Sequence, residues 1–242
     1  MTSRLAIFDI DGTLTATNEV DDECFLCAVA EVFDLPRAAA LDWSAAPHVT
    51  DSALARWLSQ EHRGRAPGDD ELTRLRARFL ELLSDELARR PDRFAAVAGA
   101  PGLFPLLRAE GWEVALATGG WRASAQLKLA AAGLDCRDVP LACADDGLTR
   151  EEIVREACAR AGFSLSASTE IVSVGDGVWD VRTAQRLGLR FVGVGEGSRA
   201  EALYRAGAGT VLPDLTDVGA VLAALDAATV PESPRSSGVT IP

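Results

Sequence analysis

A short apolar run that ends in two aspartates constrains this chain more than any other feature. Residues 5–8 (Leu-Ala-Ile-Phe) lead directly into Asp9 and Asp11, and Gly12 and Thr13 follow. The run predicts a buried strand, and residues i and i+2 of a strand lie on the same side. Both carboxylates are therefore expected to leave the strand end together. Their mutual repulsion calls for a proton or a hard divalent cation such as Mg²⁺, although aspartates in such a turn can also simply cap a strand.

Composition and charge exclude several classes of function. The chain has 242 residues, of which 48% are hydrophobic, and a formal net charge of -12. A phosphate backbone needs a basic surface, so we expect no nucleic-acid partner. No segment has the length and apolar character of a signal peptide or a membrane span, so we expect a cytoplasmic protein without a membrane partner. The sequence carries no signature of its oligomeric state.

The order of the predicted elements indicates an α/β protein with an inserted helical domain. After a first strand at 4–10, helical patterns cover 19–33, 51–61 and 69–90, and from residue 100 onward strands and helices alternate. Apolar strands that alternate with helices predict a Rossmann-like parallel sheet with helices on both faces. The later strands are expected at 113–118, 139–143, 170–175, 190–194 and 211–212, and the later helices at 102–110, 121–132, 150–161, 178–187, 198–206 and 215–226.

This pattern divides the chain into three parts. Residues 1–15 and 99–226 are expected to form the core domain, and residues 16–98 an all-helical domain inserted after the first strand. Residues 227–242 are rich in Pro, Ser and Gly, which predicts a disordered tail.

Polar residues follow two further strands at the edge where such sheets bind ligands. Thr118 and two glycines come directly after the strand at 113–118. This arrangement suits a phosphate cradle, because free backbone N–H groups at a helix start point at the anion, but it also suits an ordinary helix cap. Asp176 follows the strand at 170–175, and Asp180 lies one helical turn farther on. Four acids and a hydroxyl are thus expected at three strand ends of one sheet.

The chain resembles the haloacid dehalogenase-like superfamily, whose members are mostly Mg²⁺-dependent phosphatases and phosphotransferases. The matching segments are residues 9–13 (Asp-Ile-Asp-Gly-Thr), 118–120 (Thr-Gly-Gly) and 175–180 (Gly-Asp-Gly-Val-Trp-Asp). They stand in the family's order and spacing, and the resemblance covers residues 4–226. The helical insertion between the first two motifs looks like the C1 cap of this family.

The resemblance implies roles for the four acids. Asp9 would be the nucleophile, and Asp11 the general acid and base. Mg²⁺ would be held by the Asp9 carboxylate, the Asp11 backbone carbonyl and Asp176, with Asp180 orienting the waters of the metal.

The phosphate-binding residues are less sharply defined. Thr118 and the Gly119 amide would hold the phosphoryl oxygens. The family usually adds a lysine ahead of the helix that precedes the fourth motif, but Arg150 stands at the start of that helix here. Lys128, which is the only lysine, lies one helix earlier. Either cation can compensate the phosphate charge, and we favour Arg150.

These roles lead to the expectation of a Mg²⁺-dependent phosphatase that hydrolyses a small phosphomonoester through an aspartyl-phosphate intermediate. The partner would be a small phosphorylated metabolite. A phosphomutase that acts on a sugar phosphate with the same nucleophile is the alternative. A binding module that kept only the fold is disfavoured, because every acidic position is present.

Overall fold

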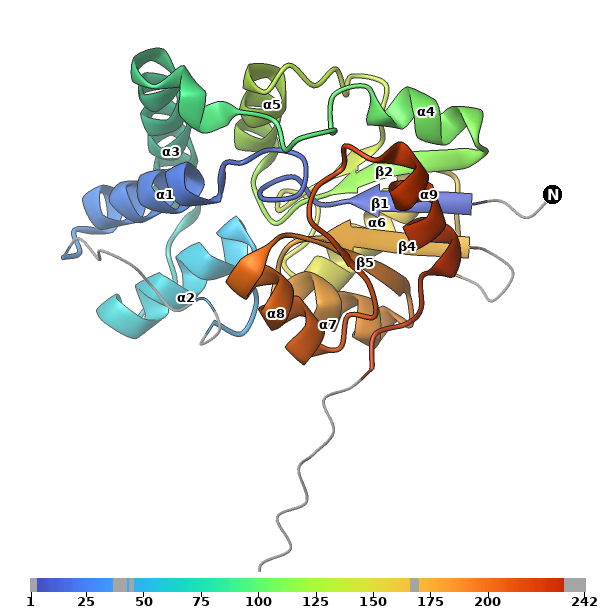
Figure 1. Ribbon diagram of the computed structural model, residues 1–242. Helices are drawn as coiled ribbons and strands as arrows, with labels where there is room; N and C mark the ends of the chain where they lie inside the picture. Colours follow the sequence, from blue (N-terminus) through green and yellow to red (C-terminus); the bar gives the residue numbers. More distant parts are fainter. Residues whose placement is uncertain (1–3, 37–42, 44–45, 166–169, 233–242) are drawn as a thin grey trace, which may run out of the picture.

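The computed structural model describes residues 4–36, 43, 46–165 and 170–232 (Figure 1). Its centre is a six-stranded parallel sheet in the order β3-β2-β1-β4-β5-β6. β1 lies in the middle because its apolar residues are buried on both faces, as the continuous run at 5–8 predicts. The strands are β1 (Arg4–Phe8), β2 (Trp112–Ala117), β3 (Leu141–Ala142), β4 (Glu170–Gly175), β5 (Arg190–Val194) and β6 (Val211–Leu212).

Helices cover both faces of the sheet, which confirms the predicted fold class. The helices α4 (Leu103–Ala109), α5 (Arg122–Ala131) and α9 (Val218–Ala227) pack on one face with alternate strand residues such as Phe8. The helices α6 (Arg150–Arg160), α7 (Val178–Leu187) and α8 (Gly197–Ala206) pack on the other face with Leu5 and Ile7. In Figure 1, α4 and α9 lie on the opposite side of the strands from α7 and α8. Each face is thus a separate hydrophobic layer.

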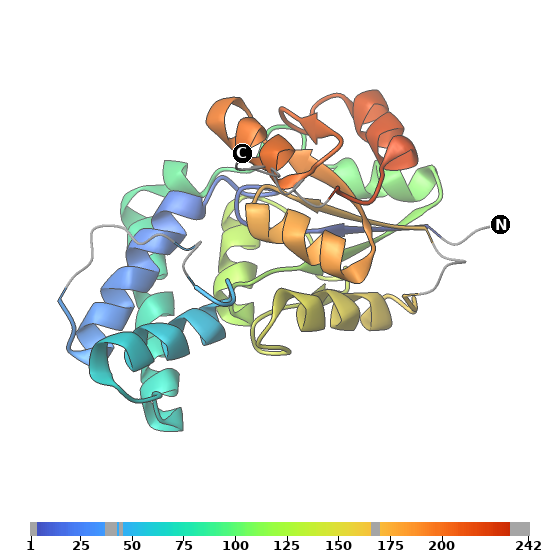
Figure 2. The same ribbon diagram turned by 90° about the horizontal axis from the view of Figure 1, so that it is seen from below.

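The helical insertion lies beyond the carboxyl ends of the strands, where both views place it (Figures 1 and 2). It comprises α1 (Asn18–Phe33), α2 (Asp51–Arg63), α3 (Asp69–Arg89) and the 3₁₀ turn η2 (Pro91–Phe94), and we call it the cap. Its two connections to the core run side by side, because Ala16 N–H donates to the Ala95 carbonyl at 2.8 Å and Val97 N–H to the Leu14 carbonyl at 2.9 Å. The cap is thus joined to the core through one narrow, hydrogen-bonded stalk.

An aromatic cluster and a short polar seam fix the cap on the core. Trp121, from the core, packs on Phe25 and Phe79 of the cap with ring centroids 5.9 and 6.0 Å apart. At the start of α2, Asp51 N–H donates to the Gly119 carbonyl at 2.8 Å. Thr50 caps the same helix by accepting from Ala53 N–H, as the helix start requires. The first turn of α2 therefore lies directly over the loop that follows β2.

The observed bounds differ from the predicted ones by a few residues at most, except at the C-terminus. α9 ends at Ala227, and the chain then runs beside β5, where Phe191 N–H donates to the Thr229 carbonyl at 3.0 Å. Residues 227–232 of the predicted disordered tail are thus placed against the core, and residues 233–242 lie outside the described part. Within the described residues, no helix is both long enough and apolar enough to cross a membrane.

Candidate active site

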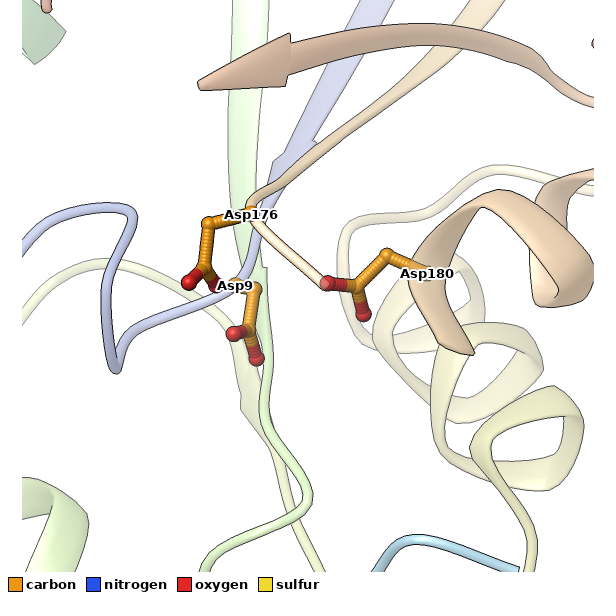
Figure 3. A group of neighbouring side chains, drawn as sticks. All are labelled: Asp9, Asp176 and Asp180. Atoms are coloured by element: carbon orange, nitrogen blue, oxygen red, sulfur yellow. The ribbon is translucent and has the colours of Figure 1, made fainter. Parts of the chain in front are cut away.

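Three buried carboxylates meet at the carboxyl ends of β1 and β4. The two strands are paired in register, with Phe8 opposite Val174, so Asp9 and Asp176 leave the sheet nearly side by side. Asp180 comes from the first turn of α7 and turns toward them (Figure 3). One carboxylate oxygen of each residue lies within 4.8 Å of those of the other two. The parallel register thus brings Asp9 together with two acids that lie 167 and 171 positions farther along the sequence.

Two glycines leave the space that this cluster needs. Gly12 has φ of 77°, and a Cβ there would lie 2.0 Å from Asp176 Oδ2. A Cβ on Gly175 would lie 2.5 Å from Asp180 Oδ2. Only a residue without a side chain fits either position, since real Cβ atoms do not approach oxygen so closely.

The electrostatics of the cluster fit a divalent cation. Burial raises the pKa of Asp9 to about 7, Arg150 opposes this, and the neighbouring Asp180 and Asp11 add to it. Burial also raises the pKa of Asp176 to about 7 and that of Asp180 to about 6. The side chains present thus leave negative charge uncompensated in a buried place. Three carboxylate oxygens gathered in one buried place suit a hard divalent cation, and Asp180 belongs to this group together with Asp9 and Asp176.

Asp11 points away from that cluster toward the base of the cap. Its Oδ1 accepts from Thr17 Oγ1 at 2.5 Å, and its Oδ2 accepts from Lys128 Nζ at 2.6 Å. Lys128 also donates to Asp21 Oδ1 of the cap at 2.5 Å and is fully buried. Burial lowers the pKa of Lys128, but the two carboxylates more than reverse this and raise it.

Arg150 lies beside the nucleophile position. Its Nη1 donates to Asp9 Oδ1 and to Asp180 Oδ1, each at 3.0 Å, and its Nε donates to the Val49 carbonyl of the cap at 3.0 Å. The Thr149 side chain caps α6 and thereby sets where the helix begins, which places Arg150 at the sheet edge. Between the two cations that the sequence suggested, this placement favours Arg150 as the third-motif cation.

A cavity of about 290 Å³ joins the predicted phosphate-binding residues to the acids. Thr118, Gly119 and Arg150 line it together with Asp9 and Asp11, whereas Lys128 does not. Thr118 is buried at the end of β2, and its Oγ1 accepts from Gly120 N–H at 3.1 Å. The site therefore offers a hydroxyl, a glycine loop and a guanidinium within one small space beside the carboxylates.

Sequence reasoning did not predict several contacts that hold this site together. Asn18 Nδ2 donates to Asp176 Oδ2 at 2.9 Å, and Arg199 of α8 forms an ion pair with the same oxygen at 3.1 Å. Asp51 is buried and accepts from Trp121 N–H at 2.8 Å, and burial raises its pKa to about 7. Arg199 and Asp51 carry no motif, because they lie outside the three strand ends that the sequence singles out.

The arrangement has a counterpart among known families. The family model for haloacid dehalogenase-like hydrolases matches residues 4–188, which include the four acids, Thr118 and Arg150. The chain belongs to the haloacid dehalogenase-like hydrolases. No curated protein sequence matches it significantly.

Solved structures share the fold over nearly the whole chain. A hydrolase from Pseudomonas syringae is 24% identical with a TM-score of 0.69, over 91% of this chain and 98% of that chain. A CbbY from Rhodobacter sphaeroides in complex with phosphate is 19% identical with a TM-score of 0.68, over 90% and 97%. A putative beta-phosphoglucomutase from Bacteroides vulgatus is 16% identical with a TM-score of 0.66, over 92% and 88%. At these sequence identities, the similarity shows a shared fold and nothing beyond the fold.

Proposed function

We propose that this hydrolase is a Mg²⁺-dependent phosphatase that acts on a small phosphomonoester through an aspartyl phosphate on Asp9. The observation that carries the proposal is the meeting of Asp9, Asp176 and Asp180 within 4.8 Å beside Arg150. Phosphoryl transfer requires an in-line nucleophile and dispersal of charge over the phosphoryl oxygens, and this group of side chains supplies both. The cavity of about 290 Å³ suits a small substrate.

In the proposed reaction, an Asp9 carboxylate oxygen attacks the phosphorus, and the bond to the leaving oxygen breaks. Asp11 gives its proton to the departing alkoxide. A water then attacks the phosphorus of the aspartyl phosphate, its proton passes to Asp11, and the bond between phosphorus and the Asp9 oxygen breaks. These two steps return both aspartates to their starting states and release the alcohol and inorganic phosphate.

The remaining residues bind and orient. Thr118 Oγ1 and the Gly119 amide would donate to the phosphoryl oxygens, and Arg150 would add positive charge. Asp9 and Asp176, with the Asp11 backbone carbonyl, would hold Mg²⁺, and Asp180 would orient its waters or bind it directly. The bound Mg²⁺ would supply charge stabilisation to the phosphoryl oxygens.

The test is the release of inorganic phosphate from a panel of phosphorylated metabolites, with and without Mg²⁺. Asp9→Asn should lower turnover by a factor on the order of 10⁴ or more, with an unchanged circular dichroism spectrum. Asp135→Asn is the matched control, because Asp135 is exposed and does not line the cavity. Substantial turnover by the Asp9→Asn variant would remove Asp9 from its role. Isomerisation of a sugar phosphate that needs a phosphorylated activator, without net phosphate release, would instead identify the phosphomutase alternative.

A further inference from the structure

Lys128 is a charged side chain that the proposed reaction does not use, although it is the only lysine and is fully buried. It projects from α5 and meets Asp11 Oδ2 at 2.6 Å and Asp21 Oδ1 at 2.5 Å. Asp11 belongs to the loop after β1, whereas Asp21 belongs to the first turn of cap helix α1. Lys128 thus joins a candidate catalytic acid to the cap from a third element.

A buried ion pair of this kind is a poor device for stability alone. Removing two charges from water costs several kcal/mol each, and well-packed apolar residues of the same volume often stabilise a protein as well or better. The other buried residues of α5 are Ser124, Ala125 and Leu129, which are small or apolar, so the helix itself would accommodate an apolar side chain at this position. A function that requires a cation at this place explains its presence better than packing does.

The contacts of Asp11 indicate what that function is. Its two carboxylate oxygens accept from different donors, with Thr17 on Oδ1 at 2.5 Å and Lys128 on Oδ2 at 2.6 Å. Thr17 lies at the far end of the loop that carries Asp11, whereas Lys128 belongs to α5, so the bond from Lys128 ties the carboxyl group to a separate element of the fold. Lys128 provides the charged and therefore stronger of the two bonds. Without it, one side of the carboxyl group is free to turn.

We infer that Lys128 is a positioning residue that holds the Asp11 carboxyl group in the geometry needed to protonate the leaving oxygen. The inference rests on the proposed function and deepens it. Proton transfer requires the donor within hydrogen-bond reach of the leaving oxygen, and general acid catalysis contributes on the order of 10²- to 10⁴-fold. Lys128 does not touch the substrate in this account and acts only through Asp11.

The test exploits the leaving group. An alkyl phosphate needs protonation as its P–O bond breaks, whereas 2,4-dinitrophenyl phosphate releases a stable anion without it. Because kcat/KM reports only the steps up to formation of the aspartyl phosphate, it isolates the leaving-group step from the later hydrolysis. Lys128→Met should lower kcat/KM by about 100-fold for the alkyl phosphate that the wild type hydrolyses best, and by less than about threefold for the dinitrophenyl ester.

Two further variants separate positioning from folding. Asp21→Asn removes the other ion pair of Lys128 and leaves its bond to Asp11, so the ratio of the two kcat/KM values should stay within about threefold of the wild-type ratio. The double variant Lys128→Met with Asp21→Asn leaves no unpaired charge at the Asp21 position, which guards against misfolding of the single variant. It should show the same selective loss as Lys128→Met.

The outcomes are distinct. A folded variant without Lys128 whose kcat/KM values fall equally for both substrates, or for neither, overturns the positioning role and leaves the phosphatase proposal standing. Selective loss in Asp21→Asn as large as in Lys128→Met also overturns it, because the effect would then come from the ion-pair network as a whole. Absence of Asp9-dependent turnover of either ester by the wild type would overturn the proposed function, and this inference with it.

Discussion

Removal of metal at different pH values tests the electrostatic reading of the site directly. The pKa of Asp176 is about 7 in the folded, metal-free chain and 3.8 as the reference value for an unfolded chain. At pH values between these two pKa values, Asp176 is protonated in the folded state and ionised in the unfolded state. This contribution to stability is fully present below about pH 4 and is lost as the pH rises to about 7. The metal-free protein should therefore become less stable across that window.

The magnitude follows from the linkage relation. One such carboxyl group changes the free energy of unfolding by up to about 1.4 kcal/mol per pH unit, which gives about 2 kcal/mol between pH 5 and pH 7 from Asp176 alone, because the group is already half ionised at pH 7. Asp9 and Asp180, whose pKa values are also raised, act in the same direction. Carboxylates with lowered pKa values, such as Glu152, titrate below their ordinary value of 4.5 and so do not oppose the effect in this window.

The assay is urea unfolding at pH 5, 6 and 7 in EDTA and again in saturating Mg²⁺. Mg²⁺ should remove the part of the loss that comes from Asp9, Asp176 and Asp180, because it binds their ionised carboxylates in the folded state and its affinity rises with pH. The part that comes from Asp51, whose pKa is also raised to about 7, should remain. Asp176→Asn should reduce the slope in EDTA by up to about 1.4 kcal/mol per pH unit. Asp135→Asn should leave it unchanged, because the pKa of Asp135 is lowered to about 2. A metal-free protein that is as stable at pH 7 as at pH 5 would refute the reasoning.

Two other substitutions test single contacts. Arg150→Lys keeps the positive charge near Asp9 but loses the Nε bond to the Val49 carbonyl at 3.0 Å. In steady-state kinetics, KM should therefore rise by about tenfold while kcat changes by less. A lower KM would contradict this expectation. Gly12→Ala places a Cβ 2.0 Å from Asp176 Oδ2 at a φ of 77°. Mg²⁺ binding measured by calorimetry should therefore weaken at least about tenfold. Unchanged binding would show that the loop around residue 12 rearranges without cost to the site.

The sheet and the acid cluster were predictable from the sequence for a physical reason. Buried parallel strands require continuous apolar runs, and glycines or polar residues must end them, so β4, β5 and α7 begin and end at the predicted residues. Once the sheet is parallel, its carboxyl ends share one edge. The convergence of Asp9 and Asp176 then follows from the strand order and register, and no knowledge of side-chain contacts is needed to predict it.

The contacts across the boundary between cap and core were not predictable in the same way. Asn18 and Arg199 both reach Asp176, but nothing in their local patterns distinguishes them from solvated helix residues. Their partners depend on how the cap and α8 sit relative to the sheet, which local periodicity does not specify. The first turn of α2 over Gly119 is a consequence of the same placement.

Lys128 lies between the predictable strand-end acids and the unpredictable contacts of cap and core. Its surrounding sequence indicates a buried position, although the motifs alone do not assign its partner. It lies at position i+4 from Ser124 and between Ala125 and Leu129 on the buried face of α5. A lysine inside such a stripe must find carboxylates, since an unpaired buried ammonium is too costly. The helix follows the loop of the second motif, so the nearest acids available to it are those of the first motif and the cap start. A buried cation beside a strand end that carries two aspartates therefore points to a role for the acid it contacts, here Asp11.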